Sequence, residues 1–351
     1  MALKELSIPP TTISLLTTSK CTAACKDCCF ACNPRNKDRL TLEEMKDYIE
    51  QSVEAYSSIK VLVLTGGECF TLGKDLDKII KYGADKGLVV RVVTNGYWAK
   101  SFKKAYLKLE KLKKMGLKEF NISTGDAHQE FVSFDSVVYA IVAALKLNLI
   151  VVVNIETSPI SNFNSETLKN DFRLKKYIDN KNLIIINGVW MPFTKSTKLE
   201  LLDMKNKKND LINKISYKKC KSLFNTMSVL PDNQMNACCG LTSKYNPFLN
   251  LGSLKTHLVK ELYEHQFKDF LKIWLFTEGP QKILDFIYKI DPTQKIDTTG
   301  WHICQICAEI FRSEEKLKII QKNYRKVFSK VILDYSFQQK NIINSQKKLD
   351  L

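Results

Sequence analysis

Apolar residues in the first half of the chain fall into short, nearly continuous runs that predict buried β-strands. Each run is five to seven residues long and rich in Val, Ile and Leu, as expected for strands covered on both faces. The predicted strands are Thr12–Thr18, Lys60–Thr65, Leu88–Val93, Lys118–Ser123, Leu149–Ile155 and Leu183–Asn187. Segments with apolar residues three and four positions apart lie between them and predict helices near residues 41–57, 75–85, 102–115, 134–147 and 166–179. Thr41 and Glu44 form a capping box that marks the start of the first helix.

This alternation gives six strand-then-helix periods and predicts an α/β fold. Consecutive βα units form a parallel sheet with right-handed crossovers. Six units rather than eight suggest a partial (β/α)6 TIM barrel. Polar motifs directly follow several strands, which places them on the rim where barrel enzymes hold their catalytic residues.

The pattern changes after about Ser196, where a Lys- and Asn-rich stretch begins. Pro231-Asp232-Asn233 predicts the turn of a small hairpin. Leu258–Ile290 reads as amphipathic helix interrupted at Gly279-Pro280, and a further helix is expected from Ala308. We therefore predict a small C-terminal α+β domain after the barrel. The expected divisions are an N-terminal lead-in (1–11), the barrel (12–195), a bridge (196–219), the C-terminal domain (220–310), and a helix with a basic tail (311–351).

Composition narrows the class of protein. The chain of 351 residues has no run approaching the ~18 apolar residues of a membrane span, and Met1–Thr12 shows no secretory signal. Eleven cysteines without a signal indicate a reducing cytoplasm, where clustered thiols read as metal ligands. The net charge of +17 favours an acidic partner, or else reflects a solvated Lys-rich surface. Nucleic acid is not expected as a partner, because no aromatic-interleaved basic motif accompanies the charge.

Five cysteines lie within the twelve residues from Cys21 to Cys32. The first three, Cys21, Cys25 and Cys28, have the spacing C-x3-C-x2-C. Three thiolates can hold three irons of a [4Fe–4S] cube and leave the fourth iron open, whereas electron-transfer clusters normally use four cysteines. The alternative is a zinc knuckle, which prefers C-x2-C pairs and four protein ligands.

The cysteine loop, Gly66-Gly67-Glu68 after the second strand and the six-unit pattern together resemble the radical S-adenosylmethionine (SAM) enzymes over roughly residues 12–195. The resemblance implies that Cys21, Cys25 and Cys28 bind a [4Fe–4S] cluster whose open iron chelates SAM. It places Gly66, Gly67 and Glu68 beside the methionine amino group.

Other positions depart from the family pattern or match it less specifically. The residue before the third cysteine is commonly aromatic and is Asp27 here, with Phe30 nearby as a cofactor contact. The residue after the glutamate is often proline and is Cys69 here. Ser123 and Asn154 match positions that often bind SAM, with strand-end capping as the alternative.

Two further residues and three cysteines stay less defined. Asp126 and His128 follow the fourth strand and are candidates to face the substrate, with a surface histidine as the alternative reading. Cys29, Cys32 and Cys69 have no assigned role and fit packed structural thiols.

The C-terminal domain resembles the shortened auxiliary-cluster (SPASM or twitch) domains of radical SAM enzymes that modify peptides. The resemblance implies a second [4Fe–4S] cluster held by Cys220, Cys238, Cys304 and Cys307, with zinc as the alternative. Cys239 is then available as a hydrogen-atom donor, with a buried cysteine or a second-choice ligand as the alternative.

The extended motif Cys28–Pro34 and the late Cys-x2-Cys resemble the epimerases that install D-residues in ribosomal epipeptides. The expected partners are a ribosomally made precursor peptide and an electron donor such as flavodoxin or ferredoxin. The first strand begins near residue 12, so we expect the peptide to dock on the barrel rim, the bridge or the basic tail.

Two alternatives stay open. A maturase forming thioether or carbon–carbon cross-links would use the same cofactors. A protein of another class, a zinc-stabilised basic binding protein, would use the cysteine clusters and the +17 charge without SAM.

Overall fold

A computed structural model describes residues 6–157, 161–189 and 215–349 and divides the chain into two compact units. The barrel unit comprises Thr12–Thr194 with Val229–Asn233. The C-terminal unit comprises Met1–Thr11, Lys195–Ser228 and Gln234–Leu351. Most of the predicted bridge (196–219) lies outside the described residues.

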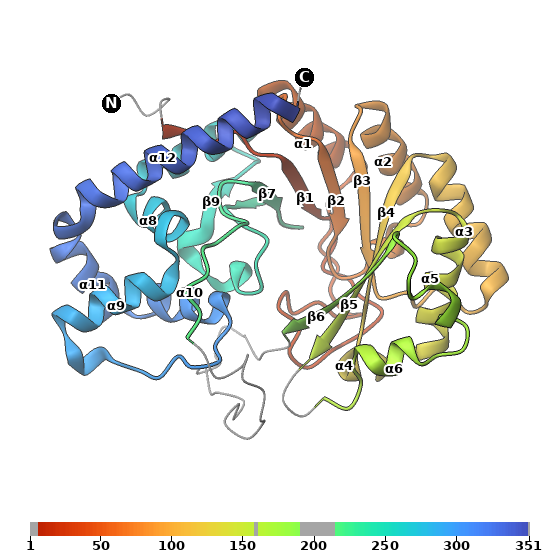
Figure 1. Ribbon diagram of the computed structural model, residues 1–351. Coiled ribbons are helices and arrows are strands. Elements are labelled where there is room, and N and C mark those ends of the chain that lie inside the picture. The colour runs from red at the N-terminus through yellow and green to blue at the C-terminus, as the bar shows by residue number, and fades with distance from the viewer. Residues whose placement is uncertain (1–5, 158–160, 190–214, 350–351) are drawn as a thin grey trace. The chain divides into compact units, whose positions relative to one another are not determined.

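The barrel unit is built on six parallel strands that neighbour one another in chain order (Figure 1). They are β1 (Thr12–Leu16), β2 (Val61–Thr65), β3 (Val89–Thr94), β4 (Leu117–Thr124), β5 (Ile150–Thr157) and β6 (Leu183–Val189). The prediction of an α/β fold with the parallel sheet of a partial TIM barrel is confirmed.

Helices connect the strands, and the long ones gather on one face of the sheet, whereas the short α4 lies near the carboxyl ends of the strands (Figure 1). They are α1 (Leu42–Ala55), α2 (Lys74–Asp85), α3 (Phe102–Lys114), α4 (Asp126–Gln129), α5 (Phe134–Lys146) and α6 (Ser165–Lys169). The predicted capping box opens α1: Glu44 N–H donates to Thr41 Oγ1 at 3.2 Å and Thr41 N–H donates to Glu44 Oε2 at 2.8 Å.

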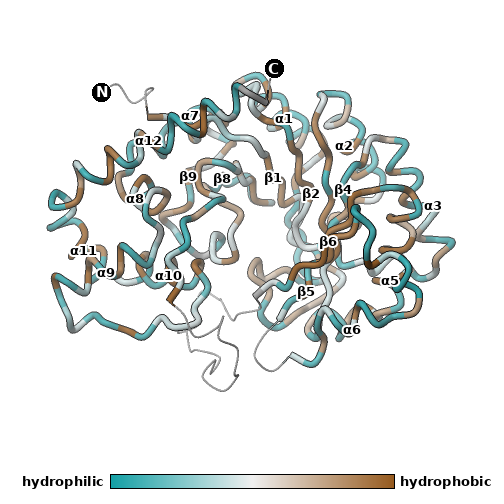
Figure 2. Tube along the Cα trace, in the orientation of Figure 1, coloured by the Kyte–Doolittle hydropathy of each residue, from teal (hydrophilic) through white to brown (hydrophobic). Residues whose placement is uncertain are grey.

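The two faces of the sheet differ in polarity. Side chains on the helix-covered face, such as Leu64, Val92 and Ile122, are fully buried. The other face carries polar side chains, including Asn121 and Ser123, between its apolar ones. Figure 2 shows the strands largely hydrophobic and the helices mixed along their length. Burial against helices accounts for the apolar runs, and the other face is where a ligand has polar partners.

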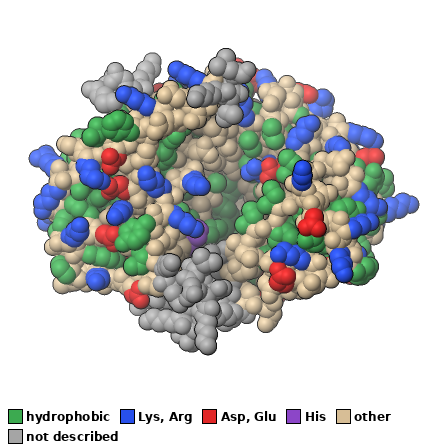
Figure 3. All heavy atoms as spheres, viewed as in Figure 1, with side chains coloured by type: hydrophobic (Ala, Val, Ile, Leu, Met, Phe, Trp, Pro, Cys, Tyr) green, Lys and Arg blue, Asp and Glu red, His purple; other side chains and the backbone are tan. Residues whose placement is uncertain are grey.

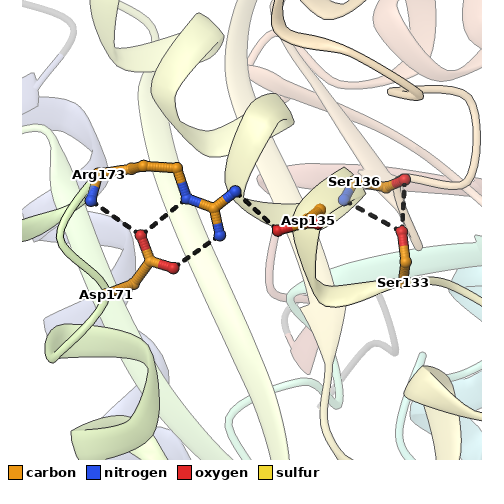
Figure 4. A network of polar contacts seen from close by, with 5 residues as sticks. All are labelled: Ser133, Asp135, Ser136, Asp171 and Arg173. Carbon is orange, nitrogen blue, oxygen red and sulfur yellow. Dashed lines mark hydrogen bonds and ion pairs between the residues drawn. The ribbon is translucent and has the colours of Figure 1, made fainter.

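The helix predicted over 166–179 is wrong: α6 ends at Lys169, and only the short 3₁₀ segment Lys175–Tyr177 follows. Asp171 ends the helical path because its carboxylate accepts from Arg173 N–H at 2.9 Å (Figure 4). The Arg173 guanidinium then binds Asp171 through Nε at 2.9 Å and Nη2 at 2.7 Å, and reaches Asp135 at 2.7 Å. This turn of side-chain hydrogen bonds competes with helix at Asp171.

The C-terminal unit combines short strands with helices. The strands are β7 (Thr226–Val229), β8 (Gln234–Asn236) and β9 (Asn250–Ser253), and β8 pairs antiparallel with β9. The helices are α7 (Val259–His265), α8 (Phe270–Glu278), α9 (Pro280–Ile290), α10 (Ile303–Arg312), α11 (Glu314–Asn323) and α12 (Arg325–Leu349). The predicted turn at Pro231-Asp232-Asn233, which is assigned to the barrel unit, joins β7 to β8. The predicted helix break falls at Gly279, whose φ is 85°.

Two features of this unit differ from the sequence predictions. The helix expected from Ala308 begins at Ile303, so Cys304 and Cys307 lie on it, one turn apart. The stretch expected to end in a polar tail is the 25-residue helix α12. Aromatic packing of Phe328 on Phe270, with ring centroids 5.0 Å apart, joins α12 to α8.

The N-terminal lead-in is held by the same unit. Gln339 donates to the Ser7 carbonyl at 2.8 Å, and the Tyr335 hydroxyl donates to the Leu6 carbonyl. Tyr263 donates to the Ile8 carbonyl at 2.8 Å. Side chains of α7 and α12 therefore hold residues 6–8 in place by hydrogen bonds to their backbone carbonyls.

The charge distribution on the surface and the composition of the helices relate to the predictions of an acidic partner and of no membrane span. On the face shown in Figure 3, Lys and Arg side chains are scattered rather than gathered into one patch. No helix in the described ranges combines the length and apolar composition required to cross a membrane.

Candidate cluster and cofactor site

The cysteine loop leaves the carboxyl end of β1 and is closed at its base by backbone hydrogen bonds. Cys21 N–H donates to the Asn33 carbonyl at 3.1 Å, and Ser19 N–H donates to the Asp38 carbonyl at 2.9 Å. Inside the loop, Cys28 N–H bonds the Cys25 carbonyl at 3.3 Å. The loop is therefore a closed structure attached to the strand rather than an open excursion.

The structure brings the three predicted ligand cysteines together. Cys21 is buried in a cluster with Ala23 and Cys32, and Cys25, Cys28 and Phe30 pack against this cluster. Burial raises the pKa of the Cys21 thiol to about 11 and that of Cys25 to about 12. A hydrogen bond from the Cys32 thiol lowers the pKa of Cys28 to about 6. Because metals bind thiolates, occupation of this site displaces protons from the buried thiols.

Gly66 and Gly67 lie against the backbone that enters the cysteine loop. Gly67 N–H donates to the Thr18 carbonyl at 2.6 Å, and Glu68 N–H donates to the Lys20 carbonyl at 2.9 Å. A Cβ on Gly67 would lie 2.4 Å from the Lys20 oxygen, and one on Gly66 would lie 2.5 Å from the Thr18 oxygen. The glycines thus allow this turn to pack on the backbone that follows the chain's own first strand.

Glu68 is fully buried, and its carboxylate accepts hydrogen bonds from the chain itself. The donors are Phe70 N–H at 3.0 Å, the Thr94 hydroxyl at 2.9 Å and Asn95 N–H at 2.8 Å. Burial raises the pKa of Glu68 to about 7, against the lowering effect of these donors. Glu68 therefore ties the turn after β2 to the turn after β3.

Asn95 was not singled out from the sequence, although it directly follows β3. Its amide Nδ2 donates to Thr22 Oγ1 at 3.1 Å and approaches Cys21 Sγ at 3.7 Å. The available signal was its position: Asn95 is a polar residue at a strand's carboxyl end, like Ser123.

Ser123 and Asn154 are brought together as register partners on β4 and β5, and both are partly exposed. Asn121, two residues before Ser123 on the same face, is 9% exposed. Its Oδ1 has no hydrogen-bond partner among the described residues. A buried amide oxygen without a protein partner fits contact with a bound ligand.

Asp126 and His128 have protein partners in the loop after β4. Asp126 accepts from Asn162 N–H at 2.6 Å and Phe163 N–H at 3.0 Å, which is a structural use of the carboxylate. The His128 ring contacts the Glu156 carboxylate through Nδ1, and His128 N–H donates to Glu156 Oε1 at 3.1 Å. His128 is thus held by Glu156, which the sequence analysis did not identify.

The cysteines without a predicted role are placed as follows. Cys69 is fully buried, and its thiol donates to the Val93 carbonyl at 3.2 Å, a structural role. Cys32 is buried in the loop beside Cys28, and Cys29 is partly exposed.

The four cysteines predicted for a second cluster also lie together, in the C-terminal unit. Cys238 and Cys307 are buried, and each interacts electrostatically with Cys220 and Cys304. Sulfurs of Cys304 and Cys238 lie 3.3 and 3.6 Å from where a Cβ on Gly240 would be. Gly240 thus leaves room between two sulfurs.

Polar groups of the chain surround these four sulfurs. Backbone N–H groups donate to three of them: Leu223 to Cys220, Gly240 to Cys238 and Leu241 to Cys304. The Asn246 amide reaches Cys307 at 4.0 Å. Such N–H donors are a usual setting for iron–sulfur clusters.

Cys239 differs from its neighbour: it is exposed, whereas Cys238 is buried. In the described part of the chain, no three His, Cys, Asp or Glu side chains converge as ligands of a single metal ion would. A cubane sets a different requirement, because its thiolates bind separate irons. The two groups of cysteines therefore fit iron–sulfur clusters, because they consist of thiols and are largely buried.

Comparison with known proteins finds a match over the barrel unit. The radical SAM superfamily profile matches residues 15–162. The putative peptide biosynthesis protein YydG of Bacillus subtilis (strain 168) is 28% identical over 129 residues, which cover 36% of this chain and 39% of that protein. The solved structure of hexahistidine-tagged anSMEcpe with bound AdoMet has a TM-score of 0.50 and 14% identity, over 93% of this chain and 98% of that chain, which shows the fold alone. Residues 15–162 therefore match a radical SAM domain.

Proposed function

We propose that this protein is a radical SAM enzyme that epimerises L-residues of a ribosomally made peptide to D-residues. The match of residues 15–162 to the radical SAM superfamily supports SAM and a [4Fe–4S] cluster as cofactors. The observation that carries the cofactor assignment is the closed loop of Cys21, Cys25 and Cys28 joined to the turns after β2 and β3. The description of YydG as a putative peptide biosynthesis protein supports a peptide substrate.

Residues of the barrel unit hold the cofactor in this proposal. Cys21, Cys25 and Cys28 bind three irons. When bound and reduced by one electron, the cluster and SAM supply a 5′-deoxyadenosyl radical. Ser123 and Asn154 contact SAM from the polar face of the sheet, together with Asn121. Phe30 packs beside the cofactor.

The Gly66–Glu68 turn presents its backbone to the methionine end of SAM. The Glu68 carboxylate is fully buried and accepts from three donors of the chain, so its part is to hold this turn in place. The methionine amino group contacts the backbone of the turn in this proposal.

His128, oriented by Glu156, lies in the loop after β4 and faces the substrate in this proposal. A histidine whose Nδ1 is held by a carboxylate has a fixed ring orientation, which suits positioning of a peptide.

The C-terminal unit supplies the second half of the reaction. Cys220, Cys238, Cys304 and Cys307 bind the auxiliary [4Fe–4S] cluster, which leaves the exposed Cys239 thiol as hydrogen donor. The substrate Cα–H bond breaks as its hydrogen atom passes to the 5′-deoxyadenosyl radical, which leaves 5′-deoxyadenosine and a carbon radical. The Cys239 S–H bond then breaks to form a new Cα–H bond on the opposite face. The resulting thiyl radical takes one electron and one proton to restore the thiol. An external donor such as flavodoxin or ferredoxin supplies both electrons of the cycle.

The test uses anaerobically reconstituted enzyme with SAM, reductant and candidate precursor peptides in D2O. Epimerisation adds one deuterium for each modified residue, because the thiol exchanges with solvent, and chiral analysis then finds D-amino acids. A cross-linking maturase instead removes two hydrogens per modification, and that mass loss would refute the epimerase assignment. The zinc-binding alternative predicts a colourless protein with stoichiometric zinc instead of roughly eight irons per chain.

Cys239→Ala tests whether this thiol donates the hydrogen atom. Cys69→Ala is a matched control, because the Cys69 thiol is buried and donates a hydrogen bond to the Val93 carbonyl. Cys239→Ala should still cleave SAM but yield no D-residue, whereas Cys69→Ala should retain epimerisation. A Cys239→Ala enzyme that produces D-residues would remove this thiol from the mechanism.

A further inference from the structure

The side chain of Asn95 joins the turn after β3 to the cysteine loop that follows β1. We propose that Asn95 is a positioning residue whose amide donates an N–H···S hydrogen bond to the Cys21 thiolate and thereby raises the reduction potential of the radical SAM cluster. The inference rests on the proposed assignment of Cys21 as a cluster ligand.

The orientation of the amide is determined by its neighbours. Tyr97 N–H donates to Asn95 Oδ1 at 3.0 Å, so the oxygen must lie on that side. The Nδ2 group, on the opposite side, has two N–H donors and two acceptors, Thr22 Oγ1 at 3.1 Å and Cys21 Sγ at 3.7 Å. Exchanging the oxygen and nitrogen would place two donors face to face at Tyr97 and would leave Cys21 opposite an oxygen.

The residue is fixed by its backbone as well as by its side chain. Asn95 N–H donates to the buried Glu68 carboxylate at 2.8 Å, and the same carboxylate accepts from the Thr94 hydroxyl. Thr94 in turn accepts from Trp98 Nε1 at 3.1 Å. Asn95 is itself 6% exposed. The amide is therefore held toward the sulfur before any cluster binds.

The expected effect on the cluster follows from charge. A reduced cluster carries one more negative charge than an oxidised one, and hydrogen bonds to its sulfurs stabilise the reduced state more. The effect is stronger at a buried site, where water does not screen the donor. Cys21 also accepts from Ala23 N–H at 3.4 Å, so Asn95 adds a second donor, contributed by a residue 74 positions away in the sequence.

The test is an EPR-monitored redox titration of reconstituted wild type, Asn95→Leu and Asn95→Asp, without SAM and with iron content measured in each. Leu removes the donor at similar volume. Asp retains an oxygen for Tyr97 but places negative charge near Cys21. The cluster potential should become more negative in Asn95→Leu and more negative still in Asn95→Asp. Variants that retain iron at the wild-type potential would overturn the proposal.

A measurement on the wild type keeps the proposal testable if the variants fail to bind iron. In protein labelled with 15N only at asparagine, pulsed EPR of the reduced cluster should detect a weakly coupled 15N nucleus. Absence of that coupling would refute the hydrogen bond. A wild-type protein that binds no iron–sulfur cluster refutes the proposed function itself, whereas an active enzyme without the coupling or the potential shift refutes this inference alone.

Discussion

Substitution of Gly67 by alanine tests whether the turn after β2 sets the position of the cysteine loop. The new Cβ would lie 2.4 Å from the Lys20 carbonyl oxygen and 2.7 Å from its carbon. Both atoms belong to backbone, so no side chain can rotate away. Overpacking of this kind costs about 1–3 kcal/mol, and we expect the upper part of that range. The backbone of Lys20 must move, and Cys21 moves with it.

Gly87 provides a matched control that separates contact from backbone strain. Its φ is +78° and a Cβ there would meet nothing within 4 Å, so Gly87→Ala costs only the strain of a left-handed conformation, about 1–2 kcal/mol. Gly66→Ala combines a φ of +135° with a contact at 2.5 Å to the Thr18 oxygen. It should cost about 2–5 kcal/mol.

The assay pairs iron content after anaerobic reconstitution with the denaturant midpoint of each holoenzyme. Gly67→Ala should lose the iron of the radical SAM cluster while the auxiliary cluster remains, which removes about half of the roughly eight irons per chain. Gly87→Ala should be destabilised and keep its iron. Full iron in Gly67→Ala, or equal iron loss in Gly87→Ala, would refute the argument that this turn positions the cysteines.

Three further predictions concern polar groups of the barrel unit. Arg173→Leu leaves the largely buried Asp171 carboxylate without its partner and should lower the free energy of unfolding by about 2–4 kcal/mol, measured by urea denaturation. Gly125→Ala combines a φ of +138° with a Cβ 2.2 Å from the Glu156 carboxyl carbon. It should cost about 1–3 kcal/mol and reduce peptide turnover more than SAM cleavage. Because burial raises the pKa of Glu68 to about 7 from 4.5, the folded state holds this proton more tightly. The stability advantage of wild type over Glu68→Gln should therefore be largest below pH 4.5 and decline as the pH rises through 7.

The strands and helices of the barrel unit could be predicted because the order of apolar and polar residues along the chain reflects which residues are buried. The helix-covered face of each strand must be apolar, and α1 carries its own start signal in Thr41 and Glu44. The failure over residues 166–179 has a local cause. The periodicity continued through the segment, but Asp171 offered the backbone a competing hydrogen bond, and Arg173 stabilised it.

The cysteine ligands could be proposed from spacing, but the residues that hold them could not. Cys21, Cys25 and Cys28 lie on one loop, so their proximity follows from their spacing in the chain. Asn95 and Glu156 act on residues many positions away, through contacts that exist only once the parallel strands are aligned. The sequence showed that polar residues follow the strands. The sequence alone did not indicate that Asn95 contacts the Cys21 sulfur or that Glu156 contacts His128.

The Gly66-Gly67-Glu68 motif acts on the protein's own structure in addition to its expected role beside SAM. Its glycines admit the backbone of Thr18 and Lys20, and its carboxylate binds the turn that carries Asn95. Three strand ends, of β1, β2 and β3, are thereby joined by hydrogen bonds at one edge of the sheet. Parallel strands in sequential order place these ends side by side, so each turn supports the next. The cysteine loop is consequently positioned by the ends of β2 and β3, and cluster assembly should depend on residues that bind no iron.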